Sequence, residues 1–301
     1  MYNKKSKGID KMLKNWIQKN CDELNGKLIA ITGSTGDLAK EMCKTLASLG
    51  ANLLFLNRNK EKTASLKKEL LSTYGIKIYE INVDLESFSS VKKASKELNK
   101  YDIDVFILAA GAYKIERRIS DIGYDNVYQI NFISQYYLAR KVAEKMETNK
   151  KGKIVIVSSI AHNYSKINEN DIDFKNNTHC TKVYGNSKRF FMFSMYELFK
   201  NFKYVKLSVT HPGISYTNIT SHYPKWLLYI IKYPMKIIFP KPKKASLSII
   251  KGIYDDCNYL EWIGPKLFNI WGYPKKKTIK TATKEEISKI EEITNSIYNN
   301  L

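Results

Sequence analysis

The chain has 301 residues, 44% of them hydrophobic, which suits one globular α/β domain with a substantial core. Lys and Arg number 50 against 29 Asp and Glu, so the formal net charge of +21 favours an anionic partner, unless it reflects a general compositional bias. The four cysteines are far apart and no His/Cys cluster occurs, which argues against a disulfide framework or a metal site and favours a reducing compartment.

The N-terminal segment, residues 1–25, is predicted to form a basic amphipathic helix. Its apolar residues recur at helical spacing with lysines between them: Ile9, Met12, Leu13, Trp16 and Ile17. Two interpretations stay open, a helix that packs on its own domain and a helix that lies on an acidic membrane surface.

We expect a cytoplasmic protein, with peripheral membrane contact as the alternative. No apolar signal segment is present at the N-terminus. The most apolar run, residues 226–239, is too short to span a bilayer and carries two lysines and a proline.

Short apolar runs alternate with amphipathic stretches from residue 28 to about 201. The runs are LIAIT (28–32), NLLFL (52–56), KIYEI (77–81), DVFILAA (104–110), KIVIVSS (153–159) and YVKLSVT (204–210). Near-continuous apolar runs are typical of parallel strands buried on both faces. The alternation predicts an α/β fold, a single-domain Rossmann-type doubly wound parallel sheet with helices on both faces.

Glycines and a capping pattern mark the expected helix ends. The helical stretches 38–50 and 60–75 close with Gly50 and Gly75, each expected to cap its helix. Thr283 and Glu286 form a capping-box pattern that opens a last helix. We therefore expect a main domain over residues 26–275 and a C-terminal helix within 276–301.

The first predicted strand runs into ITGSTGDLA, which has the context of a dinucleotide-binding turn. Gly33 and Gly36 let the backbone approach a pyrophosphate, whose charge would lie at the positive end of the following helix. Ala39 supplies the small residue that close helix–strand packing requires. The candidate binding residues here are Gly33, Ser34, Thr35, Gly36, Asp37 and Leu38.

The end of the second strand favours NADP(H), with NAD(H) as the alternative. Asn57 stands where proteins that prefer NAD usually carry an acid, and the following Arg58 can pair with a 2′-phosphate. Further candidates end the third and fourth strands, where they could hold the adenine edge or leave room for a nucleotide: Asp84, Leu85, Ala109, Ala110 and Gly111.

Four further features follow in order at predicted strand ends, where open α/β sheets bind ligands. They are Asn131 after the fourth strand, Ser158 and Ser159 at the end of the fifth, Tyr184 and Lys188 on the next helix, and HPG (211–213) after the sixth. Together they resemble the short-chain dehydrogenase/reductase superfamily over roughly residues 25–220. SSIAH (158–162), the 25-residue gap from Ser159 to Tyr184 and HPGISYT resemble its retinol-dehydrogenase-like branch.

The resemblance implies a catalytic tetrad of Asn131, Ser159, Tyr184 and Lys188. Tyr184 would be the general acid in reduction and the base in oxidation, and Lys188 would favour its phenolate and hold the nicotinamide ribose. Ser159, with Ser158 as the alternative, would hydrogen-bond the substrate oxygen. Asn131 would anchor a water that links Lys188 to solvent.

The resemblance also implies that Pro212, Gly213 and Thr217 bind the cofactor, with Thr217 at the nicotinamide carboxamide, and that a substrate lid lies at about 214–245. The sequence departs from the family pattern in two places. Asp37 stands where the branch usually has a glycine, a spacing closer to the extended branch with its nucleotide-sugar epimerases and dehydratases. LAAG replaces the usual NNAG, so Ala109 stands for an asparagine.

The predicted function is an NADP(H)-dependent oxidoreductase that interconverts a hydroxyl and a carbonyl group. The aromatic and aliphatic lid segment favours a lipophilic substrate, such as a retinoid-like, steroid-like or long-chain compound. The alternatives are a non-catalytic nucleotide-binding regulator or scaffold and a nucleotide-sugar epimerase or dehydratase. A homo-oligomer is compatible with the sequence, whereas no recognition motif supports a nucleic-acid partner.

Two groups of residues have simpler interpretations. His162 and His211 are expected to make local hydrogen bonds. The aromatic residues of the central helices are expected to belong to the core or a subunit interface rather than to a substrate cage: Tyr136, Tyr137, Phe190, Phe191 and Phe193.

Overall fold

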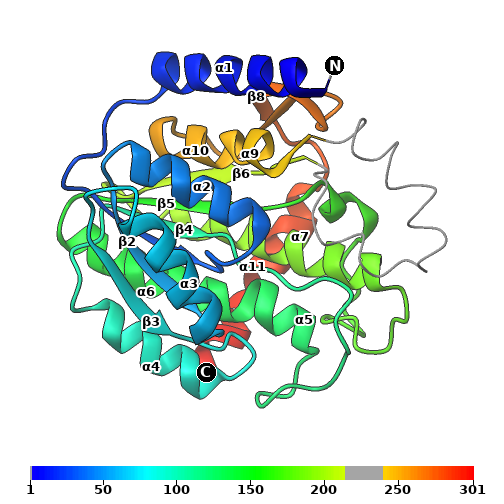
Figure 1. Ribbon diagram of the computed structural model, residues 1–301. Helices are drawn as coiled ribbons and strands as arrows, with labels where there is room; N and C mark the ends of the chain where they lie inside the picture. Colours follow the sequence, from blue (N-terminus) through cyan, green and yellow to red (C-terminus); the bar gives the residue numbers. More distant parts are fainter. Residues whose placement is uncertain (1, 214–239) are drawn as a thin grey trace.

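The computed structural model of the protein describes residues 2–213 and 240–301 (Figure 1). Thr217 and most of the predicted lid lie outside the described residues, as do the side chains of residues 2–10, Ile9 among them.

One sheet of eight strands forms the centre of the molecule, in the order β3-β2-β1-β4-β5-β6-β7-β8. The strands are β1 Leu28–Thr32, β2 Asn52–Asn57, β3 Ile78–Asn82, β4 Val105–Leu108, β5 Lys153–Val157, β6 Lys206–Thr210, β7 Glu261–Leu267 and β8 Trp271–Thr278. Neighbouring strands from β3 to β7 are parallel, and β8 is antiparallel to β7. The predicted doubly wound sheet is confirmed, and the β7–β8 hairpin is an addition that the sequence did not predict.

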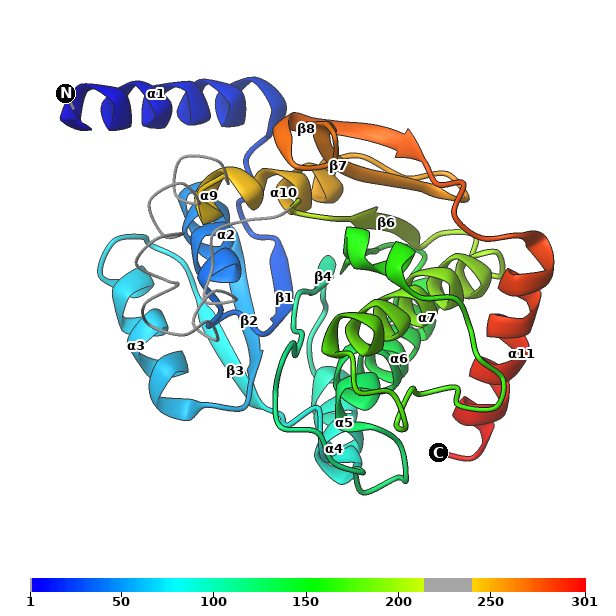
Figure 2. The ribbon, with the colours of Figure 1, turned by 90° about the vertical axis from the view of Figure 1, so that its right-hand side faces the viewer.

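Helices cover both faces of the sheet (Figure 2). They are α1 Tyr2–Asn20, α2 Asp37–Ser48, α3 Lys60–Leu71, α4 Phe88–Leu98, α5 Asn126–Tyr128, α6 Ser134–Thr148, α7 Cys180–Phe199, α9 Pro242–Ala245, α10 Leu247–Tyr254 and α11 Lys284–Asn299. A π-helical turn, η1 Gln129–Ile133, and a 3₁₀ turn, η2 Ile160–Tyr164, complete them. The strand order reverses between β1 and β4, so the carboxyl ends of these strands form the switch point at which such sheets bind ligands.

Alternate residues of each central strand enter two separate cores. In β1, Ala30 packs on the side of α4, α6, α7 and α11, whereas Ile29 and Ile31 pack on the side of α2, α3 and α10. Strands with period-2 side chains must be apolar throughout when both faces are covered, which explains the continuous apolar runs. The aromatic residues of α6 and α7 belong to the first core, as one interpretation predicted, with Phe190, Phe191 and Phe193 fully buried.

The two predicted glycine caps have different outcomes. Gly50 adopts φ +86° and donates its N–H to the Ala47 carbonyl, so it ends α2 as expected. The prediction for Gly75 is wrong, because α3 already ends at Leu71. The hydroxyls of Ser72 and Thr73 bind the Glu69 carbonyl at 2.8 and 3.1 Å, and such local bonds compete with continued helix.

Helix α1 packs on its own domain through part of its length. Leu13 is buried in the core beside α2 and α10, and the ring of Trp16 stacks on Tyr273 of β8 with centroids 6.1 Å apart. Met12 points outward and is 58% exposed. The packing interpretation is therefore borne out for this part of the helix, which leaves an outward face with Lys11 and Lys14.

Candidate active site

The glycines of the turn after β1 serve different purposes. Gly33 has φ +68°, and a Cβ on it would lie 2.8 Å from Ala110 Cα, so only glycine lets the ends of β1 and β4 lie this close. Gly36 has φ −72° and caps α2, and a Cβ there would meet only the Gly33 carbonyl at 3.6 Å. The turn therefore requires glycine at the first position and tolerates a small side chain at the second.

Asp37 is the first residue of α2. A carboxylate in the first turn stabilises a helix, since it lies near the partial positive charge of the unpaired N–H groups. A pyrophosphate bound at this turn would face the same N–H groups, so its negative charge would lie close to that of Asp37. Thr35 and Leu38 flank this helix start and are both partly exposed, whereas Ser34 is buried.

The end of β2 presents a basic side chain at the surface. Arg58 is 67% exposed, with Nη1 3.6 Å from Asp84 Oδ1. Asn57 is buried, and its Nδ2 donates to Ser34 Oγ at 2.8 Å while its Oδ1 has no partner among the described residues. Leu85 turns into the core between α4 and α6, and its carbonyl accepts from the Ser134 hydroxyl. The predicted adenine-side residues therefore surround the ends of β2 and β3.

A buried polar group fixes the end of β4, where the family asparagine is replaced by Ala109. The Ala110 N–H donates to Thr32 Oγ1 at 3.1 Å, and Gln135 Nε2 donates to the Ala110 carbonyl at 3.0 Å. Thr32 in turn donates to Gln135 Oε1 at 3.2 Å. Thr32 and Gln135 are fully buried and were missed by the sequence analysis, where each was only a polar residue beside an apolar run.

Tyr184 and Lys188 lie one turn apart on α7, facing the end of β5. Lys188 is 3% exposed, and its Nζ donates to the Val157 carbonyl at 2.9 Å and lies 5.8 Å from the Tyr184 ring centroid. Burial lowers the pKa of Lys188 to about 8. Burial raises the pKa of Tyr184 to about 12, opposed by a hydrogen bond with Ser159. At neutral pH the pair is therefore a protonated phenol beside an ammonium.

The structure distinguishes the two serines at the end of β5. Ser158 is 1% exposed, and its hydroxyl faces the core, 3.4 Å from Met192 Sδ. Ser159 caps η2, where its hydroxyl accepts from the Ala161 N–H at 3.2 Å, and it lies within hydrogen-bonding reach of Tyr184. Ser159 is therefore the serine that accompanies Tyr184.

Asn131 lies in the π-helical turn η1 and reaches the same region. Its Oδ1 accepts from the Ala112 N–H at 2.7 Å, and its Nδ2 donates to the Ala112 carbonyl at 2.9 Å and to Ser187 Oγ at 3.1 Å. A Cβ on Gly111 would lie 3.4 Å from Asn131 Oδ1 and 3.6 Å from Lys188 Nζ. Gly111 therefore lies against both Asn131 and Lys188.

Tyr113 is an aromatic neighbour of Tyr184 that the sequence analysis missed. Their rings meet edge to face with centroids 5.1 Å apart. The Tyr113 hydroxyl lies 3.1 Å from Thr181 Oγ1 on the first turn of α7. Its place, two residues after Gly111, was the only signal in the sequence.

His162 supports Ser159 from behind. Its Nδ1 lies 2.7 Å from the Ser159 carbonyl and its Nε2 2.9 Å from Thr281 Oγ1, so it makes the local hydrogen bonds that were predicted. Burial lowers the pKa of His162 to about 4, so the ring is neutral at pH 7.

A buried ion pair connects this region to α11. Arg189 is 2% exposed and binds both carboxylate oxygens of Glu286, at 2.7 Å from Nε and 2.5 Å from Nη2. Its Nη1 donates to the His162 carbonyl at 3.1 Å and its Nη2 to the Thr281 carbonyl at 2.7 Å. Half of the predicted capping box forms: Thr283 Oγ1 accepts from the Glu286 N–H, whereas the Glu286 carboxylate binds Arg189.

The HPG segment closes the same edge of the sheet. His211 is buried, stacks on Trp262 at 4.2 Å and accepts a hydrogen bond from the Gly213 N–H on Nδ1 at 3.0 Å, again a local role. Gly213 has φ +78°, and a Cβ on it would lie 3.1 Å from the Asn269 carbonyl in the β7–β8 turn. Pro212 is partly exposed beside it.

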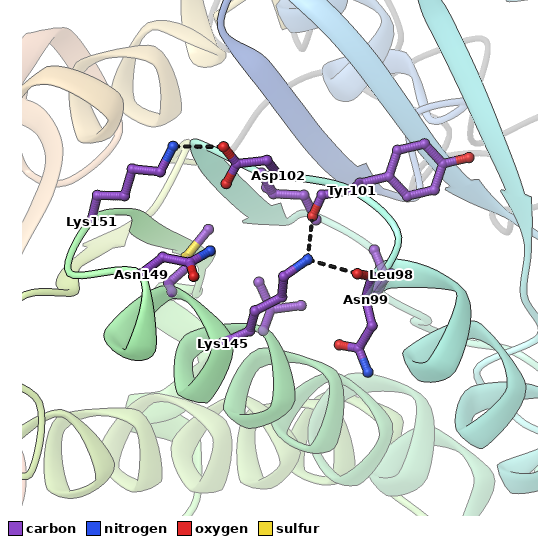
Figure 3. Close-up of a pocket in the computed structure, with 10 residues that line it drawn as sticks. Leu98, Asn99, Tyr101, Asp102, Lys145, Asn149 and Lys151 are labelled. Carbon is purple, nitrogen blue, oxygen red and sulfur yellow. Dashed lines mark hydrogen bonds and ion pairs between the residues drawn. The ribbon is translucent and has the colours of Figure 1, made fainter.

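A small pocket lies at the amino ends of β4 and β5, and its polar side chains bind one another and the nearby backbone (Figure 3). Lys145 Nζ donates to the carbonyls of Asn99 and Tyr101 at 2.8 and 2.7 Å, and Lys151 pairs with Asp102. The pocket lies before the start of β4, away from the carboxyl ends of the strands, so it does not compete with the site around Tyr184.

The described part of the chain has neither a metal-binding cluster nor a membrane-spanning helix. It contains no group of three or more His, Cys, Asp or Glu side chains arranged to hold a metal ion. None of its helices combines the length and the apolarity that crossing a membrane requires.

Comparison with known proteins gives a consistent result. A family model described as short chain dehydrogenase matches residues 27–227. Short chain dehydrogenase resG of Aspergillus sclerotiorum is 35% identical over 129 residues, which cover 42% of this chain and 36% of that protein. Human retinol dehydrogenase 11 is 24% identical over 235 residues, covering 76% and 74%. A short-chain dehydrogenase from Sphingobium yanoikuyae, solved in complex with NADPH, shares the fold with a TM-score of 0.59 at 14% identity, over 91% of this chain and 96% of that one.

The chain spans less than two thirds of the length of most of the curated relatives that it matches, resG among them. The family model nevertheless covers 201 of the 301 residues, including every strand from β1 to β6 and the Tyr184–Lys188 pair. Similarity to retinol dehydrogenase 11 and to mouse retinol dehydrogenase 14 confirms the expected branch. The chain belongs to the short chain dehydrogenase family.

Proposed function

We propose that the protein is an NAD(P)-dependent oxidoreductase that interconverts a hydroxyl and a carbonyl group, with Tyr184 as its acid and base. One observation carries the proposal. Tyr184, Ser159 and the buried ammonium of Lys188 meet at the carboxyl end of β5, beside Gly111. A structural role alone does not account for a lysine that is 3% exposed and has a carbonyl as its partner, since burying such a charge is costly.

Near neutral pH the side chain of Tyr184 is in the protonation state that reduction of a carbonyl requires. Because the pKa of Tyr184 is raised to about 12, its phenol is protonated and ready to donate to a carbonyl oxygen. Oxidation requires the phenolate, which the nearby Lys188 cation stabilises electrostatically. Ser159 would donate a hydrogen bond to the same carbonyl oxygen. Asn131 holds the Ala112 backbone, next to Gly111.

The residues around the switch point fit a nicotinamide dinucleotide. The tight Gly33 turn leads into the N–H groups at the start of α2, which suit a pyrophosphate, and Lys188 would hold the ribose. The unpaired Asn57 Oδ1 is a buried acceptor at the end of β2. When bound, the nicotinamide supplies hydride transfer.

The proposed preference for NADP(H) depends on Arg58. Its guanidinium is largely exposed at the end of β2. The residue before it is Asn57, not the acid that would bind a ribose 2′-hydroxyl in a protein that prefers NAD. Asp84 lies 3.6 Å away and can orient the guanidinium without neutralising it through a close contact.

A lipophilic substrate is part of the proposal. Two apolar features lie near the site: Tyr113 against the ring of Tyr184, and the exposed Leu267 and Phe268 in the turn beside Gly213. The name of retinol dehydrogenase 11 points to the same substrate class. A cytoplasmic location remains our proposal, supported by four cysteines that are all unpaired.

The test is the variant Tyr184→Phe, which removes only the hydroxyl. We expect turnover with NADPH and a panel of lipophilic aldehydes and ketones to fall at least ~100-fold, because a general acid contributes about 10²–10⁴-fold. NADPH affinity, measured by nucleotide fluorescence, should stay within about threefold, since a single neutral hydrogen bond contributes little. Unchanged turnover in this variant would remove Tyr184 from the mechanism.

A second candidate function is a non-catalytic scaffold of the same fold, and Asp37 is the observation that favours it, because it opposes nucleotide binding. An acid on the first turn of α2 opposes a pyrophosphate at the same place. Titration with NADPH and with NADH decides first: absence of binding to either removes the enzyme proposal. Recovery of binding in Asp37→Gly would identify the acid as the cause.

A further inference from the structure

One end of the molecule carries an unusual concentration of positive charge. Three segments, residues 11–20, 240–254 and 262–278, contain eleven lysines and no Asp, Glu or Arg. They account for more than half of the formal net charge of +21. Helices α1, α9 and α10 and strand β8, which these segments form, lie together at the upper end in Figures 1 and 2. We call this end the basic face.

Direct contacts join the elements of the basic face. The Trp16 ring of α1 stacks on Tyr273 of β8 with an interplanar angle of 2°, and Lys244 Nζ of α9 lies 5.8 Å from the same Tyr273 ring. The Tyr254 hydroxyl of α10 donates to the Asp22 carbonyl, just after α1, at 2.6 Å. The charge is therefore presented on a connected surface rather than on separate loops.

Much of this charge points to solvent. Six lysines of the basic face are exposed and form no ion pair with any described carboxylate: Lys11, Lys14, Lys19, Lys241, Lys266 and Lys275. By contrast, Lys251 at the inner side of α10 pairs with Asp255 at 3.0 Å. Clustered lysines without acids repel one another, so this arrangement is stabilised by an anionic surface.

An apolar tip projects from the same face. In the turn between β7 and β8, Ile270 N–H donates to the Leu267 carbonyl at 3.0 Å. Phe268 and Asn269 between them have φ of 51° and 58°, so this is a type I′ turn. Phe268 is 83% exposed and Leu267 52%. A bulky side chain in the left-handed region is strained. Phe268 meets Trp271 edge to face with centroids 6.4 Å apart but stays 83% exposed, so folding gives only a weak reason for it.

We propose that the basic face docks on the surface of an anionic phospholipid bilayer, with Phe268 and Leu267 entering the interface. Lysines attract anionic headgroups over a distance of about a Debye length, while apolar side chains are stabilised below the headgroups. A nucleic acid is a poorer partner for two reasons. The face has no arginine, and a phosphate backbone would not account for the exposed apolar tip of Leu267 and Phe268.

The position of the tip connects docking to the site. The Asn269 carbonyl lies next to Gly213, at the end of β6 and on the same sheet edge as Ser159. Docking would hold the substrate side of the protein close to the acyl region. This placement of the substrate side matters only if the proposed substrate is lipophilic. Docking itself does not depend on catalysis.

The test measures binding of the full chain to vesicles by co-sedimentation, without any activity assay. Vesicles of phosphatidylcholine alone are compared with equal parts of phosphatidylcholine and phosphatidylserine. We expect binding only to the anionic vesicles, and loss of binding at about 1 M NaCl, where the Debye length falls to ~3 Å. The double variant Lys266→Glu and Lys275→Glu should weaken binding at least ~25-fold. Loss of each lysine charge accounts for about fivefold, and the repulsion by the new carboxylates adds to it.

Matched variants separate docking from folding. Phe268→Asn should weaken vesicle binding roughly tenfold yet raise the melting temperature, because Asn tolerates the left-handed region better than Phe. Lys93→Glu with Lys96→Glu makes the same charge change on α4, at the opposite end in Figures 1 and 2, and should bind at least half as well as the wild type. Leu267→Asn should also weaken vesicle binding, and Ile119→Asn, at a side chain 56% exposed outside the face, is its control.

Two results would overturn the proposal. One is equal sedimentation with neutral and anionic vesicles, or none with either. The other is binding to a DNA duplex at least as tight as to anionic vesicles with no effect of Phe268→Asn, which would identify the face as a nucleic-acid surface. Because none of these readouts uses turnover, an inactive enzyme that still docks refutes only the proposed function.

Discussion

Replacing Glu286 by Gln should expose how strongly the buried Arg189 depends on its counter-ion. The change keeps the shape of the side chain but removes the charge that binds Arg189 through two contacts of 2.7 and 2.5 Å. The remaining partners are all neutral: the carbonyls of His162 and Thr281 and the side-chain oxygen that the variant retains. Arg189 is 2% exposed, so water cannot replace the lost carboxylate.

The magnitude follows from this geometry. Removing one partner of a buried ion pair costs about 3–5 kcal/mol, far more than the ~0–1 kcal/mol of a surface pair. For a chain of this size each kcal/mol lowers the melting temperature by roughly 2–4 °C, so we expect a fall of about 6–20 °C. Activity should also fall, because Arg189 holds His162, which in turn contacts the Ser159 carbonyl.

Urea unfolding and thermal melting of three variants provide the assay. Glu285→Gln, the adjacent exposed carboxylate in the same first turn, is the matched control and should leave the melting temperature nearly unchanged. Arg189→Met combined with Glu286→Leu should be more stable than Glu286→Gln, since no unpaired charge remains. A loss for Glu286→Gln no larger than that for Glu285→Gln would refute the reasoning.

Three further predictions follow from the site. Gly33→Ala should lower the free energy of unfolding by at least ~2 kcal/mol and abolish nucleotide binding, because its Cβ would lie 2.8 Å from Ala110 Cα, whereas Gly36→Ala should unfold in urea like the wild type. Arg58→Glu should weaken NADPH at least ~10-fold more than NADH in fluorescence titrations; equal losses would end the assignment of cofactor preference. The folded-state pKa of His162, about 4, lies below its ordinary value of 6.5. Between these values the unfolded chain binds one more proton than the folded protein, so stability falls as pH drops through this range. His162→Gln should therefore have a smaller difference between urea midpoints at pH 7 and 5 than the wild type, and an identical difference would contradict the burial argument.

The sheet was predictable as far as β6 because its strands are buried on both faces. That burial leaves a continuous apolar run in the sequence, which can be recognised without knowing the partners. Strands β7 and β8 have no such run: they contain Pro265 and Pro274, and β8 is rich in lysine. They form a hairpin at the sheet edge, where proline is tolerated and side chains need not be apolar.

The site was predictable only in part, for a similar reason. Tyr184 and Lys188 are four residues apart, so their proximity follows from helix geometry alone. Arg189 and Glu286 are 97 residues apart and neither has a local signal, because the pair is created by the packing of α11 on α7. The capping-box pattern even suggested a different partner for Glu286.

The pairing of α7 with α11 also sets an order of events during synthesis. Besides Arg189 and Glu286, the hydroxyls of Ser194 and Thr294 meet at 2.7 Å across 100 residues of chain. At about 5–20 residues per second, a ribosome needs roughly 5–20 s to add those residues after α7 has been made. During that interval the nascent chain holds Arg189 without its counter-ion and one side of α7 without its cover. Helix α7 is therefore completed late, and this waiting period is when the newly made protein is most open to chaperones and to aggregation.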